Sequence, residues 1–504
     1  MSSKLAAGVS LVSAANMLGG ILNLVMVVAL TRLLSKSDFA AIALIYMLFT
    51  MVSTIGTLGL PSALLFYVPK FSAGASRHLG LWTGGLLTLI ALPITLIFIT
   101  VGPLLTQQFN VPDIHHLFYI VGLALIFDFS GQTFSGYLLA KERYLSTSIV
   151  VALFVTIRFL GLTLPAYLGL GLSGMVWGLC LTTALRSLAY FIYMVMIEKG
   201  EMNRETRSSW RTKELFSYGI PLSLSSIVGR LNLQADKYMI AALTSAEVYA
   251  IYHVGALEVP LVATLAYSVT RALMPSLVQA HDQNHSDHFL TLWHTSILKV
   301  ATIILPVFVF LMFFTEPLIT LIFSADYSRA SVPFRVYLCL LPLRLCAYGA
   351  ILRAMGATKP VLTSSILSLF CNISLNYPLY LWLGLSGPAV ASVIAQFVAI
   401  FFLLSVIRQN LQITWSAVFP LRPLLSGLFI SVLSAILSMF ALTHLTKLVP
   451  QSSITPLFTL STASIVYALL YLPIAWKIGF ITTKDLHTLW VWISLKSLRT
   501  KLWS

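Results

Sequence analysis

The sequence predicts an all-α polytopic membrane protein with about 14 transmembrane helices, arranged as two parallel-repeat six-helix lobes plus two C-terminal helices. Three observations predict it: the composition, a series of apolar runs of spanning length, and an internal repeat. Hydrophobic residues make up 58% of the 504 residues and charged residues only 9%, whereas a soluble domain carries about 25% charged residues. A chain this poor in charge cannot cover its own surface with polar groups, so lipid has to cover most of it.

The apolar runs set the helix count. A spanning helix needs about 20 predominantly apolar residues, and the chain offers fourteen such runs. Prolines such as Pro61, Pro260 and Pro342 interrupt several of them and predict kinks, which membrane helices tolerate. The runs cover residues 8–30, 40–68, 79–105, 116–140, 145–168, 172–197, 216–240, 247–272, 291–315, 331–353, 361–383, 387–407, 423–446 and 455–476.

The distribution of cations between the loops predicts the orientation. Lysine and arginine are enriched on the cytoplasmic side of membrane proteins. With the N-terminus in the cytoplasm, nineteen cations fall in inside loops and tails, and only Arg32, Lys36, Arg329 and Lys447 fall outside. We therefore expect both termini to be cytoplasmic.

An internal repeat predicts the division into lobes. Four short motifs recur at one common offset, and that offset spans six helices, so the two copies keep the same orientation in the membrane. The predicted domains are an N-terminal lobe at 1–197, a cytoplasmic linker at 198–215, a C-terminal lobe at 216–410, and the last two helices with a basic tail at 411–504. The motifs are SLxS from Ser10 and Ser223, ALT from Ala29 and Ala242, PxY from Pro165 and Pro378, and GLSG from Gly171 and Gly384.

Parallel repeats of this kind favour a transporter, because they place a substrate site near the bilayer midplane between the two lobes. An enzyme is not expected. The motif formed by Gly169, Gly171 and Gly174 matches a dinucleotide fingerprint but lies in a turn between membrane helices with no strand before it. No Walker motif, metal-ligand spacing or nucleophile and base constellation is present, so we expect no catalytic residues, no metal, no cofactor and no nucleic-acid partner.

Cations within the predicted helices are the candidate site residues. A central arginine that faces lipid costs roughly 2.5–3.5 kcal/mol, so such side chains should face a wet cavity or a partner. Guanidinium binds phosphate in a planar, bidentate manner and does not deprotonate. A net-positive cavity favours an anionic head group such as a diphosphate and repels organic cations. The candidate diphosphate-binding residues are Arg158, Arg186, Arg230, Arg344 and Lys299.

Two acids lie at mid-helix and leave alternatives open. Asp128 lies at a depth similar to that of Arg158 and Arg186, and Glu258 groups in the same way with Arg230 and Arg344. Each acid either forms an internal salt bridge with one of these arginines or carries a coupling ion, H⁺ or Na⁺. The two roles are not resolved by the sequence, and neither is the choice between a coupling ion and the membrane potential as the energy source.

Several segments resemble the polysaccharide-exporter branch of the multidrug/oligosaccharidyl-lipid/polysaccharide flippase superfamily. The resemblance spans about residues 8–410. The order of these loose motifs is that of the family. They are LTRLL at 30–34 with Asp38-Phe39, YGIPL at 218–222, DKYMI at 236–240, LRAMGATK at 352–359, and the two GLSG turns.

The resemblance implies two six-helix lobes around a central cavity that work by alternating access. It implies a flippase that moves polyprenyl-diphosphate-linked oligosaccharide from the inner to the outer leaflet, for cell-surface polysaccharide such as lipopolysaccharide, in a bacterial inner (cytoplasmic) membrane. The expected partners are that glycan substrate, membrane lipid, and a polysaccharide polymerase or other assembly proteins. The two extra helices at the C-terminus occur in fourteen-helix members, where they help to hold the lipid tail.

Two alternatives belong to the same superfamily. An ion-coupled multidrug or organic cation antiporter relies on cavity acids with little opposing charge, whereas arginine is in excess here. A lipid II flippase typically carries an arginine in its first helix, and residues 8–30 contain none. Both departures favour the oligosaccharide substrate over the alternatives.

Overall fold

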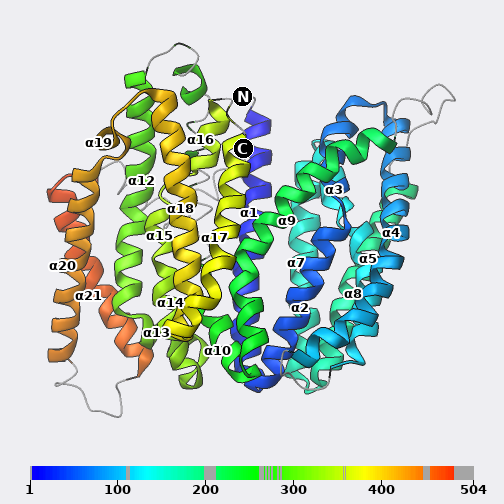
Figure 1. Cartoon of the computed structure of the whole chain (residues 1–504), viewed down its shortest axis with the longest axis horizontal. Coiled ribbons are helices and arrows are strands. Elements are labelled where there is room, and N and C mark those ends of the chain that lie inside the picture. Colours follow the sequence, from blue (N-terminus) through cyan, green and yellow to red (C-terminus); the bar gives the residue numbers. More distant parts are fainter. Residues whose placement is uncertain are drawn as a thin grey trace, which may run out of the picture. The chain divides into compact units, whose positions relative to one another are not determined.

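The protein is helical throughout the part of the chain that the structure describes (Figure 1). The computed structural model describes residues 3–108, 114–197, 212–259, 286–355, 359–445 and 455–481, together with isolated positions between 266 and 283 and residue 357. Every regular element in these ranges is a helix, which confirms the predicted all-α membrane class.

The first half of the chain forms these helices: α1 Ser3–Leu33, α2 Lys36–Gly56, α3 Leu60–Tyr67, α4 Ala73–Gln108, α5 Leu117–Gly131, α6 Thr133–Ala140, α7 Tyr144–Tyr167, α8 Gly171–Ile192, α9 Thr212–Leu243 and α10 Ala246–Gly255. The second half forms α12 Ser286–Phe313, α13 Thr315–Phe323, α14 Ser331–Leu338, α15 Leu340–Leu343, α16 Tyr348–Ala354, α17 Lys359–Leu383, α18 Ser386–Leu411, α19 Trp415–Val418, α20 Leu421–Leu445 and α21 Pro456–Lys477. Short 3₁₀ turns at Val68–Lys70 and Ala325–Ala330, and a π turn (η2) at Tyr193–Ile197, extend some of these helices.

Twelve helical segments of the described residues are long and apolar enough to cross a membrane, and each coincides with a predicted run. The two remaining predicted runs are 216–240 and 247–272. The first lies in α9, a 32-residue helix whose apolar face is interrupted by Arg230, Asp236 and Lys237. The second begins as α10, and much of it lies outside the described residues. The count of fourteen and the cytoplasmic location of both termini stay predictions.

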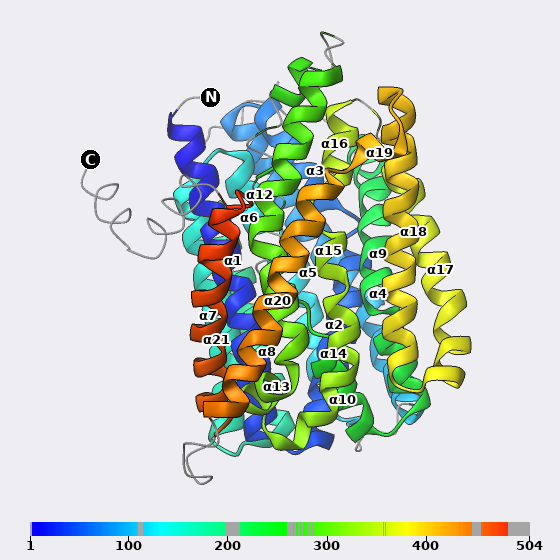
Figure 2. The same ribbon diagram turned by 90° about the vertical axis from the view of Figure 1, so that its left-hand side faces the viewer.

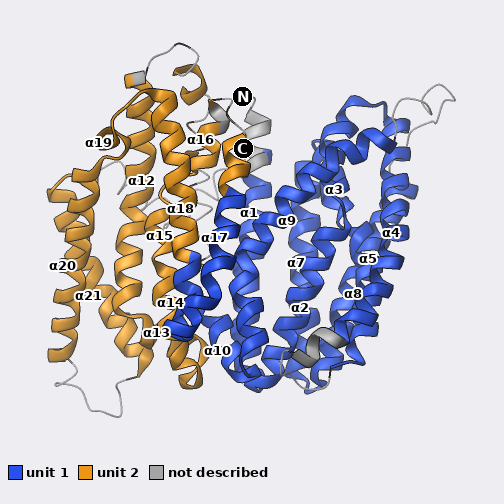
Figure 3. Ribbon diagram, in the orientation of Figure 1, with its two compact units in different colours: residues 1–256, 365–392 blue, residues 257–364, 393–504 orange. Residues whose placement is uncertain are grey.

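The chain divides into two compact units, coloured separately in Figure 3. Unit 1 comprises residues 1–256 and 365–392, and unit 2 comprises residues 257–364 and 393–504. Two of the boundaries between these units fall within α17 and α18. Most of the predicted linker, 198–211, and the end of the predicted basic tail, 482–504, lie outside the described residues.

Unit 1 is a bundle in which α7 packs against both α1 and α8, and α5 packs against both α4 and α8 (Figure 1). Glycine lets α7 and α8 approach closely: a Cβ at Gly178 would overlap the carbonyl oxygen of Gly161. Large aromatic side chains such as Phe118, Phe129 and Tyr190 fill the interior and are fully buried. Small residues at close helix contacts are typical of membrane bundles, where van der Waals packing drives association.

The run at 40–68, in which Pro61 predicts a kink, is interrupted at residues 57–59. Leu58 and Gly59 have positive φ angles of 51° and 70°, the left-handed region that ends a helix. α3 begins again at Leu60, with Pro61 in its first turn, where proline is tolerated. A Cβ at Gly59 would overlap the carbonyl oxygen of Gly219 in α9, so a close backbone approach fixes the break.

Unit 2 contains the two C-terminal helices, α20 and α21, packed against each other and against α12 (Figure 2). Val309, Ile430 and Tyr467 lie in the buried core of this packing. The run at 331–353, in which Pro342 predicts a kink, consists of the separate pieces α14, α15 and α16, with non-helical backbone after Leu343. Pro342 lacks the N–H that a continuous helix would use there.

Candidate functional site

An ion pair inside the membrane-spanning part of unit 1 joins α5 to α8. The NH2 group of Arg186 in α8 lies 2.5 Å from Oδ1 of Asp128 in α5. The Asp128 side chain is 8% exposed and the Arg186 side chain 26%, so the pair is largely removed from solvent. The other carboxylate oxygen, Oδ2, accepts hydrogen bonds from Ser53 Oγ at 2.5 Å and Gln132 Nε2 at 2.7 Å. Both oxygens of Asp128 are thus occupied by donors from the protein itself.

Gly131 permits this ion pair. A Cβ at position 131 would lie 2.9 Å from Nε of Arg186, closer than real Cβ atoms approach other atoms. A side chain there would require the Arg186 side chain to shift. Gly131, three residues from Asp128 in α5, therefore leaves room for this ion pair.

Arg158 in α7 lines the same cavity but has different partners. The cavity has a volume of about 120 Å³ and lies among side chains of α2, α5, α6, α7 and α8, including Asp128, Arg158 and Arg186. This is room for roughly four water molecules. Arg158 donates from NH2 to Asn23 Oδ1 at 3.2 Å, and its guanidinium carbon lies 5.9 Å from the ring centroid of Tyr46. Arg158 makes no ion pair with any described residue, so the cavity keeps an uncompensated positive charge.

A second ion pair lies in unit 2, between residues that follow the ends of two helices. NH1 and NH2 of Arg344 lie 2.8 and 2.9 Å from Oε2 and Oε1 of Glu258, the fork geometry of guanidinium with a carboxylate. Glu258 follows the end of α10, and Arg344 follows the end of α15. The two side chains are 39% and 22% exposed, so this pair is wetter than the pair in unit 1.

The sequence grouped two arginines with each of the two acids. In the structure, each acid pairs with one of its two arginines. Asp128 pairs with Arg186 and leaves Arg158 to the neutral Asn23. Glu258 pairs with Arg344. Internal bridges at both acids, one of the alternatives left open by the sequence, are therefore present.

The two other candidate cations have no such pairing. Arg230 is half-buried on α9 in unit 1, and Lys299 is exposed on α12 in unit 2. Neither side chain forms a salt bridge or hydrogen bond with another part of the described chain. Within unit 1, the structure thus brings Arg158 and Arg186 to one cavity around Asp128.

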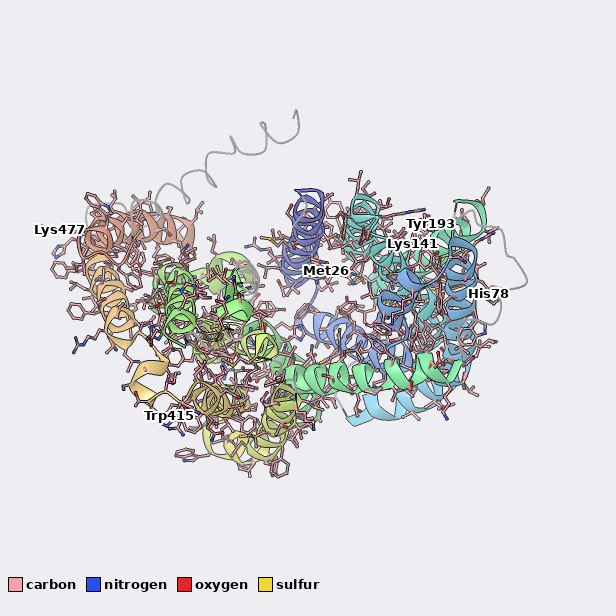
Figure 4. All side chains as sticks on the ribbon, turned by 90° about the horizontal axis from the view of Figure 1, so that it is seen from above. Met26, His78, Lys141, Tyr193, Trp415 and Lys477 are labelled. Atoms are coloured by element: carbon pink, nitrogen blue, oxygen red, sulfur yellow. The ribbon has the colours of Figure 1, made fainter. Side chains whose placement is uncertain are left out.

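Loop cations at one end of unit 1 are engaged by the protein itself. Lys141 Nζ donates to Ser76 Oγ at 2.6 Å, and Arg143 donates to the Tyr193 hydroxyl. Arg77 Nε donates to the carbonyl of Met194 at 2.8 Å, in the π turn that follows α8. Figure 4 looks onto this end of the unit and labels Lys141 and Tyr193 on neighbouring elements. Arg143 and Arg77 thus hold the segment that follows α8, and Lys141 is engaged on α4.

A cluster of amides in unit 1 was missed by the sequence analysis. Asn232 Nδ2 donates to Ser368 Oγ at 3.0 Å, and Asn372 Nδ2 donates to the Asn232 carbonyl at 3.1 Å and lies 3.3 Å from Ser392 Oγ. Asn372 and Asn376 are 1% and 3% exposed. The cluster ties α9 to α17 and α18. The only signal in the sequence was the spacing of Asn372 and Asn376 by one turn in an apolar helix. Within the described chain, no group of three or more His, Cys, Asp or Glu side chains that could hold a metal ion occurs.

Comparison with family models gives two matches. The model described as "Polysaccharide biosynthesis protein" matches residues 5–281. The model described as MatE matches residues 221–378. No curated protein matches the sequence.

Solved structures share the fold. One is the "Lipid II flippase MurJ, inward closed conformation", with a TM-score of 0.72 and 16% identity over 92% of this chain and 98% of that chain. Another is a multidrug resistance MATE family transporter of the MOP superfamily in an inward-facing conformation, with a TM-score of 0.62 and 15% identity over 78% of this chain and 94% of that chain. At such low identity the likeness shows the fold alone.

Proposed function

Because the chain belongs to the polysaccharide biosynthesis protein family, within the multidrug/oligosaccharidyl-lipid/polysaccharide flippase superfamily, we propose that it flips polyprenyl-diphosphate-linked oligosaccharide from the inner to the outer leaflet of a bacterial cytoplasmic membrane. The chain is a multi-pass membrane flippase or transporter of this superfamily. The substrate and the membrane are the proposal.

The observation that supports the proposal is the position of Arg158 and the neutral partner it has there. Arg158 lies in a polar cavity within a membrane-spanning bundle, and its one hydrogen bond goes to a neutral amide. An arginine in this position is costly unless an anion or water compensates it. A pair of phosphate oxygens matches one edge of a guanidinium, which an organic cation would not approach. A diphosphate therefore fits the cavity better than a cationic drug.

Arg186 has a different part in the proposal. Its charge is already matched by Asp128, whose two oxygens have three donors. Arg186 and Asp128 line the same cavity as Arg158, which presents its charge to that cavity. In unit 2, Arg344 binds a diphosphate only if Glu258 releases it, and Lys299 adds positive charge to that unit. Arg230 adds positive charge to unit 1. The energy source, an ion gradient or the membrane potential, belongs to the proposal as well.

The test is a deletion in the source organism. We would delete the gene, quantify polyprenyl-diphosphate oligosaccharides by mass spectrometry, and measure surface glycan. The expected result is accumulation of one lipid-linked precursor together with loss of a surface glycan. Unchanged precursor and glycan, with increased drug retention, would instead establish drug extrusion. Accumulation of lipid II would identify that substrate and reject the oligosaccharide.

Complementation then tests the site. Arg158→Ala should lower surface glycan about tenfold or more, since hydrogen bonds to charged groups contribute about 1.5–3 kcal/mol. Arg158→Lys should retain part of the activity, because it keeps the charge but not the fork. Arg422→Ala is the matched control, because Arg422 is exposed at the start of α20. Equal glycan levels in the Arg158→Ala and Arg422→Ala strains would reject Arg158 as a substrate contact.

A further inference from the structure

Arg158 links the cavity to two other helices of unit 1. From α7 it donates a hydrogen bond to Asn23 on α1 at 3.2 Å. Its guanidinium lies over the ring of Tyr46 on α2, at 5.9 Å from the ring centroid. The Tyr46 ring in turn stacks on Phe49, with centroids 6.3 Å apart and planes at 26°. The orientation of the guanidinium is therefore set from two sides.

Each of these three side chains keeps polar groups that the described protein does not use. Asn23 accepts one hydrogen bond through Oδ1, so its NH2 group retains two donors. The Tyr46 hydroxyl makes no hydrogen bond with any described residue and is half-buried. Arg158 retains NH1 and Nε as donors. Asn23 is exposed on α1, and Tyr46 and Arg158 are half-buried, so each keeps some accessible surface.

The three groups lie at one depth. Asn23 is ten residues from the end of α1 at Leu33, and Tyr46 is ten residues from the start of α2 at Lys36. At about 1.5 Å per residue both lie roughly 15 Å from the same end of the unit. The hydrocarbon core is about 30 Å thick, so a bilayer whose boundary lies at the ends of these two helices has its middle at this depth. Unsatisfied polar groups there are expensive unless a ligand or water uses them.

Their chemistry is suited to the junction of a sugar and a phosphate. A guanidinium edge binds phosphate oxygens. An amide NH2 and a phenolic hydroxyl bind sugar hydroxyls, because the amide donates and the phenol both donates and accepts. We infer that Asn23, Tyr46 and Arg158 form a subsite in which Arg158 binds the diphosphate while Asn23 and Tyr46 bind the first sugar attached to it.

This subsite rests on the proposed function and deepens it, because it makes unit 1 selective for a glycosylated carrier over the bare lipid diphosphate. A site built only from arginines would not distinguish the two. A site with hydrogen-bonding groups for the sugar prefers the ligand that satisfies them. Export of empty carrier is thereby disfavoured.

The experiment measures binding of two probes to the purified full-length protein in detergent by isothermal titration calorimetry. One probe is a short prenyl diphosphate, and the other is the same molecule with one hexose on its terminal phosphate. The wild type should bind the hexose-bearing probe about fivefold or more tightly, as expected for one or two net hydrogen bonds. Tyr46→Phe and Asn23→Ala should reduce this ratio to about twofold or less. Both should still bind the bare diphosphate, which also shows that they are folded. Arg158→Ala should weaken both probes.

Matched controls are available on the same helices or of the same type. Asn16→Ala changes another exposed asparagine of α1, and Tyr119→Phe changes an exposed tyrosine of α5; both should keep the wild-type ratio. Equal binding of the two probes by the wild type would overturn the subsite while leaving the proposed diphosphate site standing. A wild-type ratio that persists in Tyr46→Phe and Asn23→Ala would also overturn it. If the wild type binds neither probe, the proposed function fails together with the subsite.

Discussion

Asp128 holds Arg186 at 2.5 Å inside unit 1, while Arg158 in the same cavity has no carboxylate among its partners in the described chain. The two arginines of this cavity thus differ in whether a carboxylate compensates their charge. One is part of an internal ion pair, and the other presents its charge to the cavity. This difference leads to distinct expectations for their removal.

Arg186→Ala should destabilise the protein, because it leaves the Asp128 carboxylate buried without its cation. Removing one partner of a buried pair typically costs about 3–5 kcal/mol. Thermal unfolding in detergent should show a lowered midpoint, together with reduced surface glycan in cells. The double variant Asp128→Asn/Arg186→Ala should recover most of the midpoint, because neither charge then remains. Arg158→Ala should leave the midpoint near that of the wild type. If Arg186→Ala unfolds at the wild-type temperature, the ion pair is not structural.

The sequence could locate these arginines but could not tell them apart. Positions in apolar runs place Arg158, Arg186 and Asp128 at similar depths, and the cost of burying charge indicates that some of them pair. Which arginine meets the acid depends on Gly131, where the missing side chain admits the Arg186 guanidinium. That contact is between helices, and the apolar pattern of one helix carries no information about it.

The same reasoning explains which parts of the fold could be predicted. Twelve spans follow from apolar length alone, and they are present. The breaks after Gly56 and Leu343 do not follow from apolar length, because the residues around them are as apolar as the helices; Pro61 and Pro342 predict kinks near them but not where the helices end. The first break is fixed by the approach of Gly59 to Gly219, which lies far away in the sequence. The buried Asn372 and its half-buried partner Asn232 were missed because asparagine has no charge to signal its cost.

The Glu258 and Arg344 pair should behave differently from the pair in unit 1. Its side chains are 39% and 22% exposed, and solvent-exposed ion pairs contribute about 0–1 kcal/mol. Glu258→Gln should therefore change the unfolding midpoint little. It should instead free Arg344 and tighten binding of a prenyl diphosphate in a calorimetric titration. Weaker binding in Glu258→Gln would mean that Glu258 positions Arg344 for the ligand rather than competing with it.

Gly178→Ala should disrupt the contact between α7 and α8, because the new Cβ would overlap the carbonyl of Gly161. Overpacking of this kind typically costs about 1–3 kcal/mol. The matched control is Gly85→Ala in α4, where a Cβ would meet nothing within 4 Å. That change should be neutral or slightly stabilising, since alanine is the better helix former by about 1 kcal/mol. Unfolding midpoints of the two purified variants in detergent check the prediction. Equal midpoints would show that α7 and α8 can separate at no cost.

The last prediction concerns the proline in α12. Pro306 has no N–H, so the carbonyl of Thr302, four residues earlier, lacks its helical donor. The hydroxyl of Tyr471 in α21 lies 3.4 Å from that carbonyl and donates to it. Tyr471→Phe should therefore leave the carbonyl unsatisfied and lower stability by about 1 kcal/mol. In a Pro306→Ala background the helical N–H returns, and the same substitution should have little effect.

Tyr467 supplies the internal control for this cycle. Its hydroxyl donates to the carbonyl of Pro306 at 3.1 Å, but that carbonyl also has its own helical donor four residues later. Tyr467→Phe should thus have an effect that does not depend on the residue at position 306. Unfolding of the wild type and the five variants in detergent, analysed as two double-mutant cycles, should give coupling between positions 471 and 306 and none between 467 and 306. Coupling of equal size in both cycles would show that it arises from the packing of α21 against α12 around Pro306 as a whole. Tyr471 would then not replace the missing hydrogen bond.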